Sequence, residues 1–174
     1  MRSRTSDWFE TKIRYAKTQE DGTQKNVTEH YVVDALSFTE AEGAILEEMK
    51  VYISGEYKIT DIKPAAFHEI FFSDKDNDDK WYKSKLQFIT IDEKTEKEKR
   101  STVTYLVQAA TLSAAVKNIC DVMGGTMIDY NISSIAETQI MDVFEHDSAP
   151  SKHKQAGGDS LPEYMQDENK TQEA

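Results

Sequence analysis

The chain contains an internal repeat, because the sequence of residues 7–72 is similar to that of residues 80–145. Three pairs of segments keep their order along the chain: 7–15 with 80–88, 31–49 with 105–123, and 57–72 with 130–145. Identical residues at matched positions include Trp8/Trp81, Lys12/Lys85, Tyr31/Tyr105, Ile45/Ile119, Met49/Met123 and Phe71/Phe144. A duplicated unit presents one surface twice. We therefore expect an extended ligand rather than a substrate held in a single catalytic pocket.

Hydrophobic periodicity predicts an α+β fold in which each copy reads strand, strand, helix, strand, strand. Residues 8–17 alternate between apolar and polar, as a half-buried strand does, and Ser37 with Glu40 forms a capping box that opens a helix. The predicted strands are 8–17, 27–36, 57–63 and 66–72 in the first copy, and 81–91, 101–109, 127–136 and 138–145 in the second. We expect antiparallel sheets, each covered by one helix, with Phe38/Leu112 and Ile45/Ile119 buried in equivalent places.

Four segments follow from this pattern: repeat 1 at 1–73, an acidic connector at 74–79, repeat 2 at 80–146, and a disordered acidic tail at 147–174. The topology has two interpretations. The copies form two separate ββαββ modules, or the chain from Tyr57 is read as four strands and a helix. The second reading, ββββα, is the unit of the PC4, Whirly and PUR-type single-stranded nucleic-acid binders. The sequence leaves both open.

Composition limits the class of function. Of the 174 residues 38 % are hydrophobic, which is enough for a core, but no stretch approaches the roughly 20 apolar residues of a membrane span. We expect a cytoplasmic protein, because the N-terminus has no apolar leader and Cys120 is the one cysteine. No spacing of histidines, nucleophiles or glycines indicates catalysis, a metal or a cofactor, so we expect none of these. An acidic run at 74–78 resembles the start of an EF-hand loop, but Asp79 stands where that loop needs glycine.

The net charge of −11 disfavours a nucleic-acid partner, yet binding depends on the local field rather than the total. The first strand of each copy places an aromatic residue and cations on the side opposite its apolar stripe. Such a face can stack bases, at ~1–3 kcal/mol per base, and neutralise phosphates. The candidate nucleic-acid-binding residues are Trp8, Lys12, Arg14, Trp81, Tyr82, Lys83 and Lys85. The competing interpretation is that both tryptophans belong to the core.

Four motifs, at 8–15, 28–42, 80–99 and 137–144, resemble a family of uncharacterised proteins from Bacteroidetes and the crAss-like phages that infect them. The resemblance implies a non-catalytic single-stranded-DNA-binding protein of a phage replication or recombination module. We also expect a homo-oligomer, and the mixture of acidic and apolar residues in the tail indicates contact with replication proteins. The alternative function is a non-enzymatic protein-interaction or structural module, which the negative charge favours.

Overall fold

The computed structural model describes residues 1–146, and the predicted acidic tail at 147–174 lies outside them. Eleven elements follow in chain order. They are β1 (Arg2–Thr5), β2 (Trp8–Thr18), β3 (Gln24–Asp34), α1 (Phe38–Met49), β4 (Tyr57–Pro64), β5 (Glu69–Phe72), β6 (Lys80–Ile91), β7 (Glu98–Ala109), α2 (Leu112–Met123), β8 (Asp129–Glu137) and β9 (Ile140–Phe144). The predicted α+β repeat is confirmed. The short strand β1 was not predicted.

A side-chain cap opens each helix, and the cap at Ser37 was predicted. Ser37 is the N-cap of α1, and its hydroxyl accepts a hydrogen bond from the backbone N–H of Glu40 at 3.1 Å. The Glu40 carboxylate in turn accepts from the backbone N–H of Leu36 at 3.0 Å. Thr111 caps α2 in the same way, accepting from the N–H of Ala114.

The last strand of each copy joins the sheet of the other copy. One sheet has the order β4-β2-β3-β9 and the other β1-β5-β7-β6-β8. β9 runs parallel to β3, and β5 runs parallel to β7, whereas the hairpin pairs β2–β3 and β6–β7 are antiparallel. The sheets are therefore mixed, and the expectation of purely antiparallel sheets was wrong. The alternative ββββα interpretation does not describe one sheet. Of its four strands, β4 lies in one sheet and β5 to β7 lie in the other.

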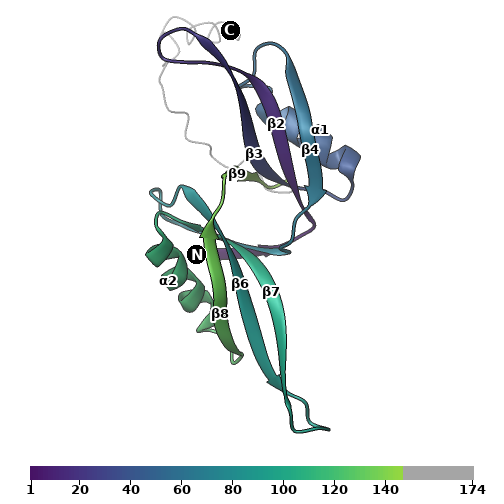
Figure 1. The fold of residues 1–174 in the computed structure, drawn as a ribbon, viewed down its shortest axis with the longest axis vertical. Helices are drawn as coiled ribbons and strands as arrows, with labels where there is room; N and C mark the ends of the chain where they lie inside the picture. Colours follow the sequence, from purple (N-terminus) through teal and green to yellow (C-terminus); the bar gives the residue numbers. More distant parts are fainter. Residues whose placement is uncertain (147–174) are drawn as a thin grey trace, which may run out of the picture.

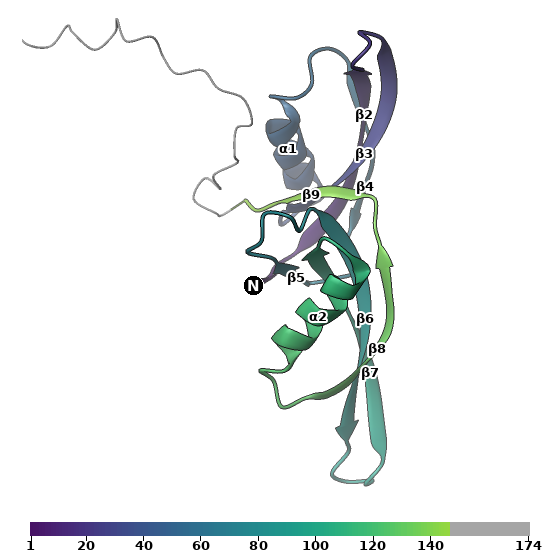
Figure 2. The ribbon, with the colours of Figure 1, turned by 90° about the vertical axis from the view of Figure 1, so that its left-hand side faces the viewer.

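Both helices cover the same side of the molecule. The two sheets follow one another along the long axis (Figure 1), and Figure 2 shows α1 and α2 together on one side of them. Ile45 in α1 and Ile119 in α2 are fully buried at equivalent places, as predicted. Phe38 and Leu112, the first residues of α1 and α2, are instead 55 % and 49 % exposed, so this part of the prediction was wrong.

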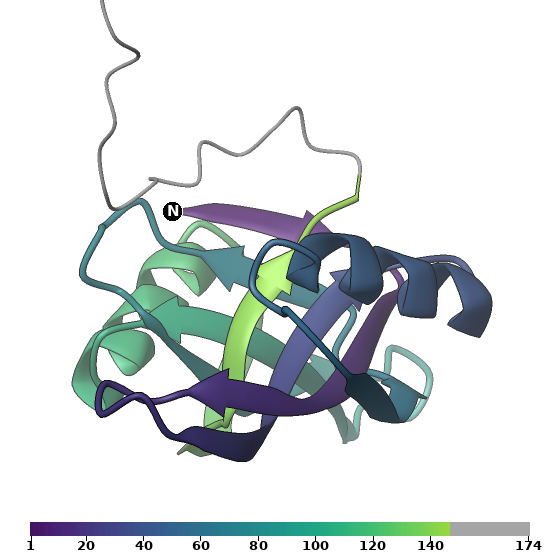
Figure 3. The same ribbon diagram turned by 90° about the horizontal axis from the view of Figure 1, so that it is seen from above.

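A third cluster of buried side chains joins the two copies. It contains Trp8, Val32, Phe67, Ile70, Trp81, Leu106, Ile140 and Val143. Ion pairs add to this junction: Arg2 contacts Glu145 at 2.7 Å, and Arg4 contacts both Asp34 and Glu145. Seen from above, β9 crosses beside β3 and β1 lies next to β5 (Figure 3), so that the exchanged strands and the N-terminal strand meet at this junction.

Candidate functional site

Side chains on each strand alternate between the helix side and the opposite side, which we call the helix-free face. On β2 the odd positions Phe9, Ile13 and Tyr15 pack toward α1, so the even positions from Glu10 to Arg14 point away from it. The same alternation on β6 sends Leu86 toward α2 and Lys83 and Lys85 away. Near the junction the helix-free sides of the two sheets pack against one another, in the buried cluster that contains Trp8 and Trp81. Lys83 of β6 also contacts Glu10 of β2 there, so the two helix-free faces adjoin.

The three predicted aromatic site residues are inside the protein. Trp8, Trp81 and Tyr82 are each 2 % exposed. The two tryptophans do project from the helix-free side of their strands, as expected, but the junction between the copies covers them. Phe72 packs edge-on to Trp81 at 5.7 Å and lies 6.5 Å from Trp8, measured between ring centroids. A base has no ring face to stack on here, so the stacking part of the expectation does not fit this structure.

The side chain of Tyr82 projects from β6 on the side opposite to those of Trp81 and Lys83. Its side chain belongs to a small buried cluster with Ala109 and Ala115, on the side that α2 covers. Burial raises the pKa of its hydroxyl, and the nearby Glu137 carboxylate raises it further. Tyr82 is therefore a core residue with a neutral hydroxyl, and it does not belong to the helix-free face.

The predicted cations lie on the helix-free face. Lys12 is 3.8 Å from the carboxylate of Asp61, and Lys83 is 2.9 Å from that of Glu10. No ion pair within residues 1–146 involves Arg14 or Lys85. The predicted cations of both copies therefore lie on adjoining faces. Two of them, Lys12 and Lys83, are each paired with a carboxylate.

Neighbouring strands add cations that sequence reasoning missed. The register places Lys58 of β4 opposite Arg14, and Lys63 opposite Glu10, so both point the same way as their partners. On β2, β4, β6, β7 and β8, the cations of the helix-free face are Lys12, Arg14, Lys58, Lys63, Lys83, Lys85 and Arg100, and the carboxylates are Glu10, Asp61, Glu98 and Asp129. The alternation of side chains at 57–63 could have indicated Lys58 and Lys63. Which side of the sheet they occupy depends on a β-bulge at Lys12/Ile13, however, and that bulge is a feature of strand pairing that the sequence does not show.

Glu10 joins the two copies electrostatically. It accepts from Lys83 of the second copy and lies 3.4 Å from Lys63 of the first. Burial alone would raise the pKa of the Glu10 carboxyl, but the hydrogen bond and charge of Lys83, with those of Lys63, hold that pKa below its ordinary value.

Burial, reinforced by the charge of Lys12, lowers the pKa of His30 on β3, so this imidazole is neutral at pH 7.

The exposed surface of α1 is acidic. It carries Glu42 and Glu47, whereas α2 carries Asp121 together with Lys117 and so has no net charge. The distribution of charge is therefore unequal: carboxylates predominate on α1, while cations outnumber carboxylates on the helix-free face. The net charge of −11 hides this difference.

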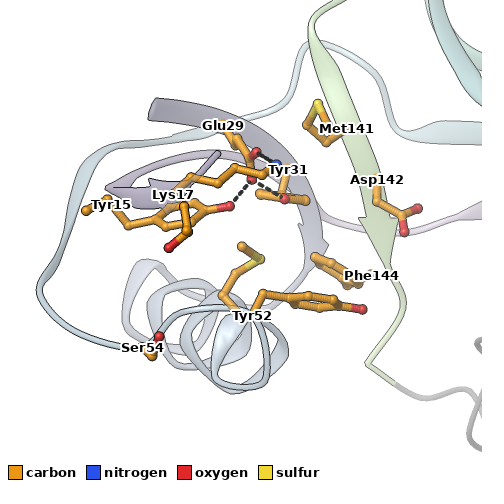
Figure 4. A pocket seen from close by; sticks show the side chains of 12 residues that line it. Tyr15, Lys17, Glu29, Tyr31, Tyr52, Ser54, Met141, Asp142 and Phe144 are labelled. Carbon is orange, nitrogen blue, oxygen red and sulfur yellow. Dashed lines mark hydrogen bonds and ion pairs between the residues drawn. The ribbon is translucent and has the colours of Figure 1, made fainter. Parts of the chain in front are cut away.

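A hollow of about 440 Å³ opens on the helix side of the first copy, between the β2–β3 hairpin, the segment after α1, and β9 (Figure 4). Its lining contains Tyr15, Lys17, Glu29, Tyr31, Tyr52 and Phe144, among others. The Glu29 carboxylate accepts hydrogen bonds from the hydroxyls of Tyr15 at 2.8 Å and Tyr31 at 2.7 Å, and from Lys17 at 3.1 Å. Sequence reasoning missed this cluster, because its members lie on two paired strands, β2 and β3, and their contacts depend on the register of that hairpin.

Within residues 1–146, no group of three His, Cys, Asp or Glu side chains is placed to hold a metal ion. The acidic run at 74–79 illustrates this, because Asp78 is buried and accepts from the Ser73 hydroxyl and the backbone N–H of Ala110. No helix in the described part of the chain is long and apolar enough to cross a membrane.

Residues 7–146 match a family described as a domain of unknown function, DUF4494. This match covers both copies of the repeat and most of the chain, so the chain belongs to that family. No curated protein and no solved structure matches the chain.

Proposed function

We propose that this member of the DUF4494 family is a non-catalytic single-stranded-DNA-binding protein whose helix-free face contacts the phosphates of the strand. One observation carries the proposal: Lys12 and Arg14 of the first copy share a surface with Lys83 and Lys85 of the second. An extended polyanion can engage both sets at once. The resemblance to proteins of Bacteroidetes and crAss-like phages supports a role in a phage replication or recombination module.

The burial of the aromatic residues changes the expected mode of binding. Since Trp8 and Trp81 are buried, attraction comes mainly from charge–phosphate contacts, which release counterions and are therefore sensitive to salt. A single strand is flexible and can follow both twisted sheets. A duplex is stiff over about 150 bp and can touch such a surface over only part of its length. We therefore expect single strands to bind more tightly than duplexes.

The test compares two double variants of the full chain that remove the same charge. Arg14→Gln with Lys85→Gln removes two helix-free-face cations, one from each copy, that make no ion pair among the described residues. Lys50→Gln with Lys117→Gln removes two exposed cations from the helix side. The affinity for labelled oligo-dT is measured by fluorescence anisotropy across a series of salt concentrations.

We expect the first variant to bind more weakly and to lower the slope of log affinity against log salt by about two units, one for each phosphate that the variant leaves without its cation. The control should keep the slope of the unaltered protein. Equal losses in both variants would show a general effect of net charge, and binding of duplex as tightly as oligo-dT would contradict the single-strand preference.

A protein-interaction module is the second candidate, and exposed apolar side chains favour it. Val51 is 81 % exposed, Tyr52 63 % and Met141 53 %. Tyr52 and Met141 both line the hollow beside Glu29, so they form one accessible apolar patch. If the full chain ignores oligo-dT at about 50 mM salt, where charge contacts are strong, this candidate takes first place.

A further inference from the structure

The two copies differ in chemistry at one equivalent place. Each has a stacked aromatic pair between its second strand and the strand received from the other copy. Tyr31 and Phe144 form it in the first copy, with ring centroids 5.4 Å apart, and Tyr105 and Phe71 form it in the second at 4.9 Å. The stacked aromatic pair is therefore common to both copies.

The polar groups around this pair occur only in the first copy. The repeat matches Tyr15 with Phe88 and Glu29 with Val103. Phe88 and Val103 pack against the core cluster under α2. The same fold is thus built with apolar residues where the first copy has a hydroxyl and a carboxylate. Because the second copy folds with apolar residues at these positions, the fold does not require the Glu29 cluster.

The cluster is held in a charged, preorganised state. Burial alone would raise the pKa of the Glu29 carboxyl, but hydrogen bonds from Tyr31, Tyr15 and Lys17 bring it below its ordinary value, so Glu29 is ionised at pH 7. Burial and the hydrogen bond to Glu29 raise the pKa of Tyr15 to about 12 and raise that of Tyr31 further. Both hydroxyls therefore keep their protons and donate to the carboxylate.

Lys17 shows which kind of group the carboxylate accepts. Its ammonium contacts Glu29 at the edge of the hollow, and its side chain is 51 % exposed, whereas that of Glu29 is only 11 % exposed. Because the ammonium end of this ion pair is exposed to solvent, water can replace the contact of Lys17, and a ligand ammonium can take the same place at Glu29. Figure 4 shows Glu29 and the two tyrosines on one side of the hollow, with Tyr52 and Phe144 nearby.

We infer that this hollow binds a primary ammonium group on an alkyl stem, which replaces Lys17 at Glu29 and lays its stem against Tyr52, Phe144 and Met141. Aromatic rings attract cations through their faces, and the apolar lining covers the stem. A lysine side chain of another polypeptide and a free diamine both carry this chemistry. The hollow lies on the helix side, away from the proposed DNA-binding face, so the inference does not depend on the proposed function.

The experiment titrates the full chain with three probes and follows backbone amide signals by NMR. The probes are 1,5-diaminopentane, a lysine blocked at both its amino and carboxyl groups, and n-pentanol as the uncharged control. We expect the two ammonium probes to shift signals of β2, β3 and β9 around the hollow and n-pentanol to leave them unchanged. Tighter binding of the blocked lysine identifies a polypeptide lysine as the source, and tighter binding of the diamine identifies a small polyamine.

Two variants make the assignment specific. Glu29→Gln keeps the shape but loses the charge, and it should weaken ammonium binding by about tenfold or more. Lys17→Gln removes the competing cation and should tighten binding about two- to fivefold, whereas Lys99→Gln, an exposed position on β7 of the second copy, should not. The Lys17→Gln result stands even if Glu29→Gln fails to fold. The inference is overturned if both the unaltered protein and Lys17→Gln ignore the ammonium probes, if n-pentanol binds as well, or if Lys99→Gln tightens binding as much as Lys17→Gln.

Discussion

Trp8 and Trp81 illustrate how a single residue can follow its predicted strand phase and still have a different role. Each projects from the helix-free side of its strand, and each is then covered by the other copy. Replacing either with Ala removes a large side chain from the junction, so we expect a loss of about 3–5 kcal/mol in the free energy of unfolding. Urea denaturation measures it. A loss below about 1 kcal/mol would show that the ring is not buried in solution.

Buried carboxylates at the junction make stability depend on pH. Burial would raise the pKa of Glu145, but hydrogen bonds and charges from Arg2 and Arg4 hold it below the ordinary value of 4.5, and Glu10 is lowered in the same direction. A carboxyl whose pKa is lower in the folded state contributes stability that is present above 4.5 and lost as pH falls through the folded-state pKa.

We therefore expect the free energy of unfolding, measured in urea from about pH 7 down to pH 3, to fall at the acid end. Glu145→Gln cannot titrate at this position, so its acid decline should be shallower than that of the unaltered protein. An identical decline in both proteins would mean that Glu145 is not paired with the two arginines.

At the scale of elements, the two helix caps are equivalent in the two copies. Ser37→Ala and Thr111→Ala each leave backbone N–H groups of the first helical turn without an acceptor. We expect each change to cost about 0.5–2 kcal/mol in the free energy of unfolding. Ser113→Ala, one residue inside α2 and exposed, is the matched control and should have little effect. Urea denaturation distinguishes the three, and no difference between Thr111→Ala and Ser113→Ala would contradict the cap.

Elements were predictable from local signals, whereas their pairing was not. Alternation and caps identified the long strands and both helices, because these signals lie within a few residues of one another. The short strand β1 carries only polar residues in RSRT, so it has no periodic signal. The parallel pairs β3–β9 and β5–β7 join residues far apart in sequence, and no single-chain pattern encodes such a choice.

The same distinction explains the candidate site. Lys12, Arg14, Lys83 and Lys85 were found because strand alternation alone orients them. The burial of Trp8 and Trp81 depends on the exchanged strands, and the Glu29 cluster depends on the pairing of β2 with β3, so neither could be predicted from one strand.

At the scale of the whole molecule, duplication, strand exchange and an unequal charge distribution act together. The last strand of each copy pairs with the sheet of the other copy. A buried cluster shared by both copies therefore joins the two sheets, and their helix-free faces adjoin at this junction. Under the proposed function, we expect a polyanion to approach the helix-free face, because α1 carries exposed carboxylates on the other side. A chain with net negative charge can therefore still present one surface suited to DNA.

The most direct test of this account maps where oligo-dT contacts the full chain, using backbone amide signals in an NMR titration at low salt. We predict that the signals which change lie on β2, β4 and β6 around Lys12, Lys58 and Lys85, in both copies at the same DNA concentration. Signals of α1 and α2 should stay in place. Changes confined to the helix side or to one copy, or no changes at all, would contradict binding of single-stranded DNA across the helix-free face.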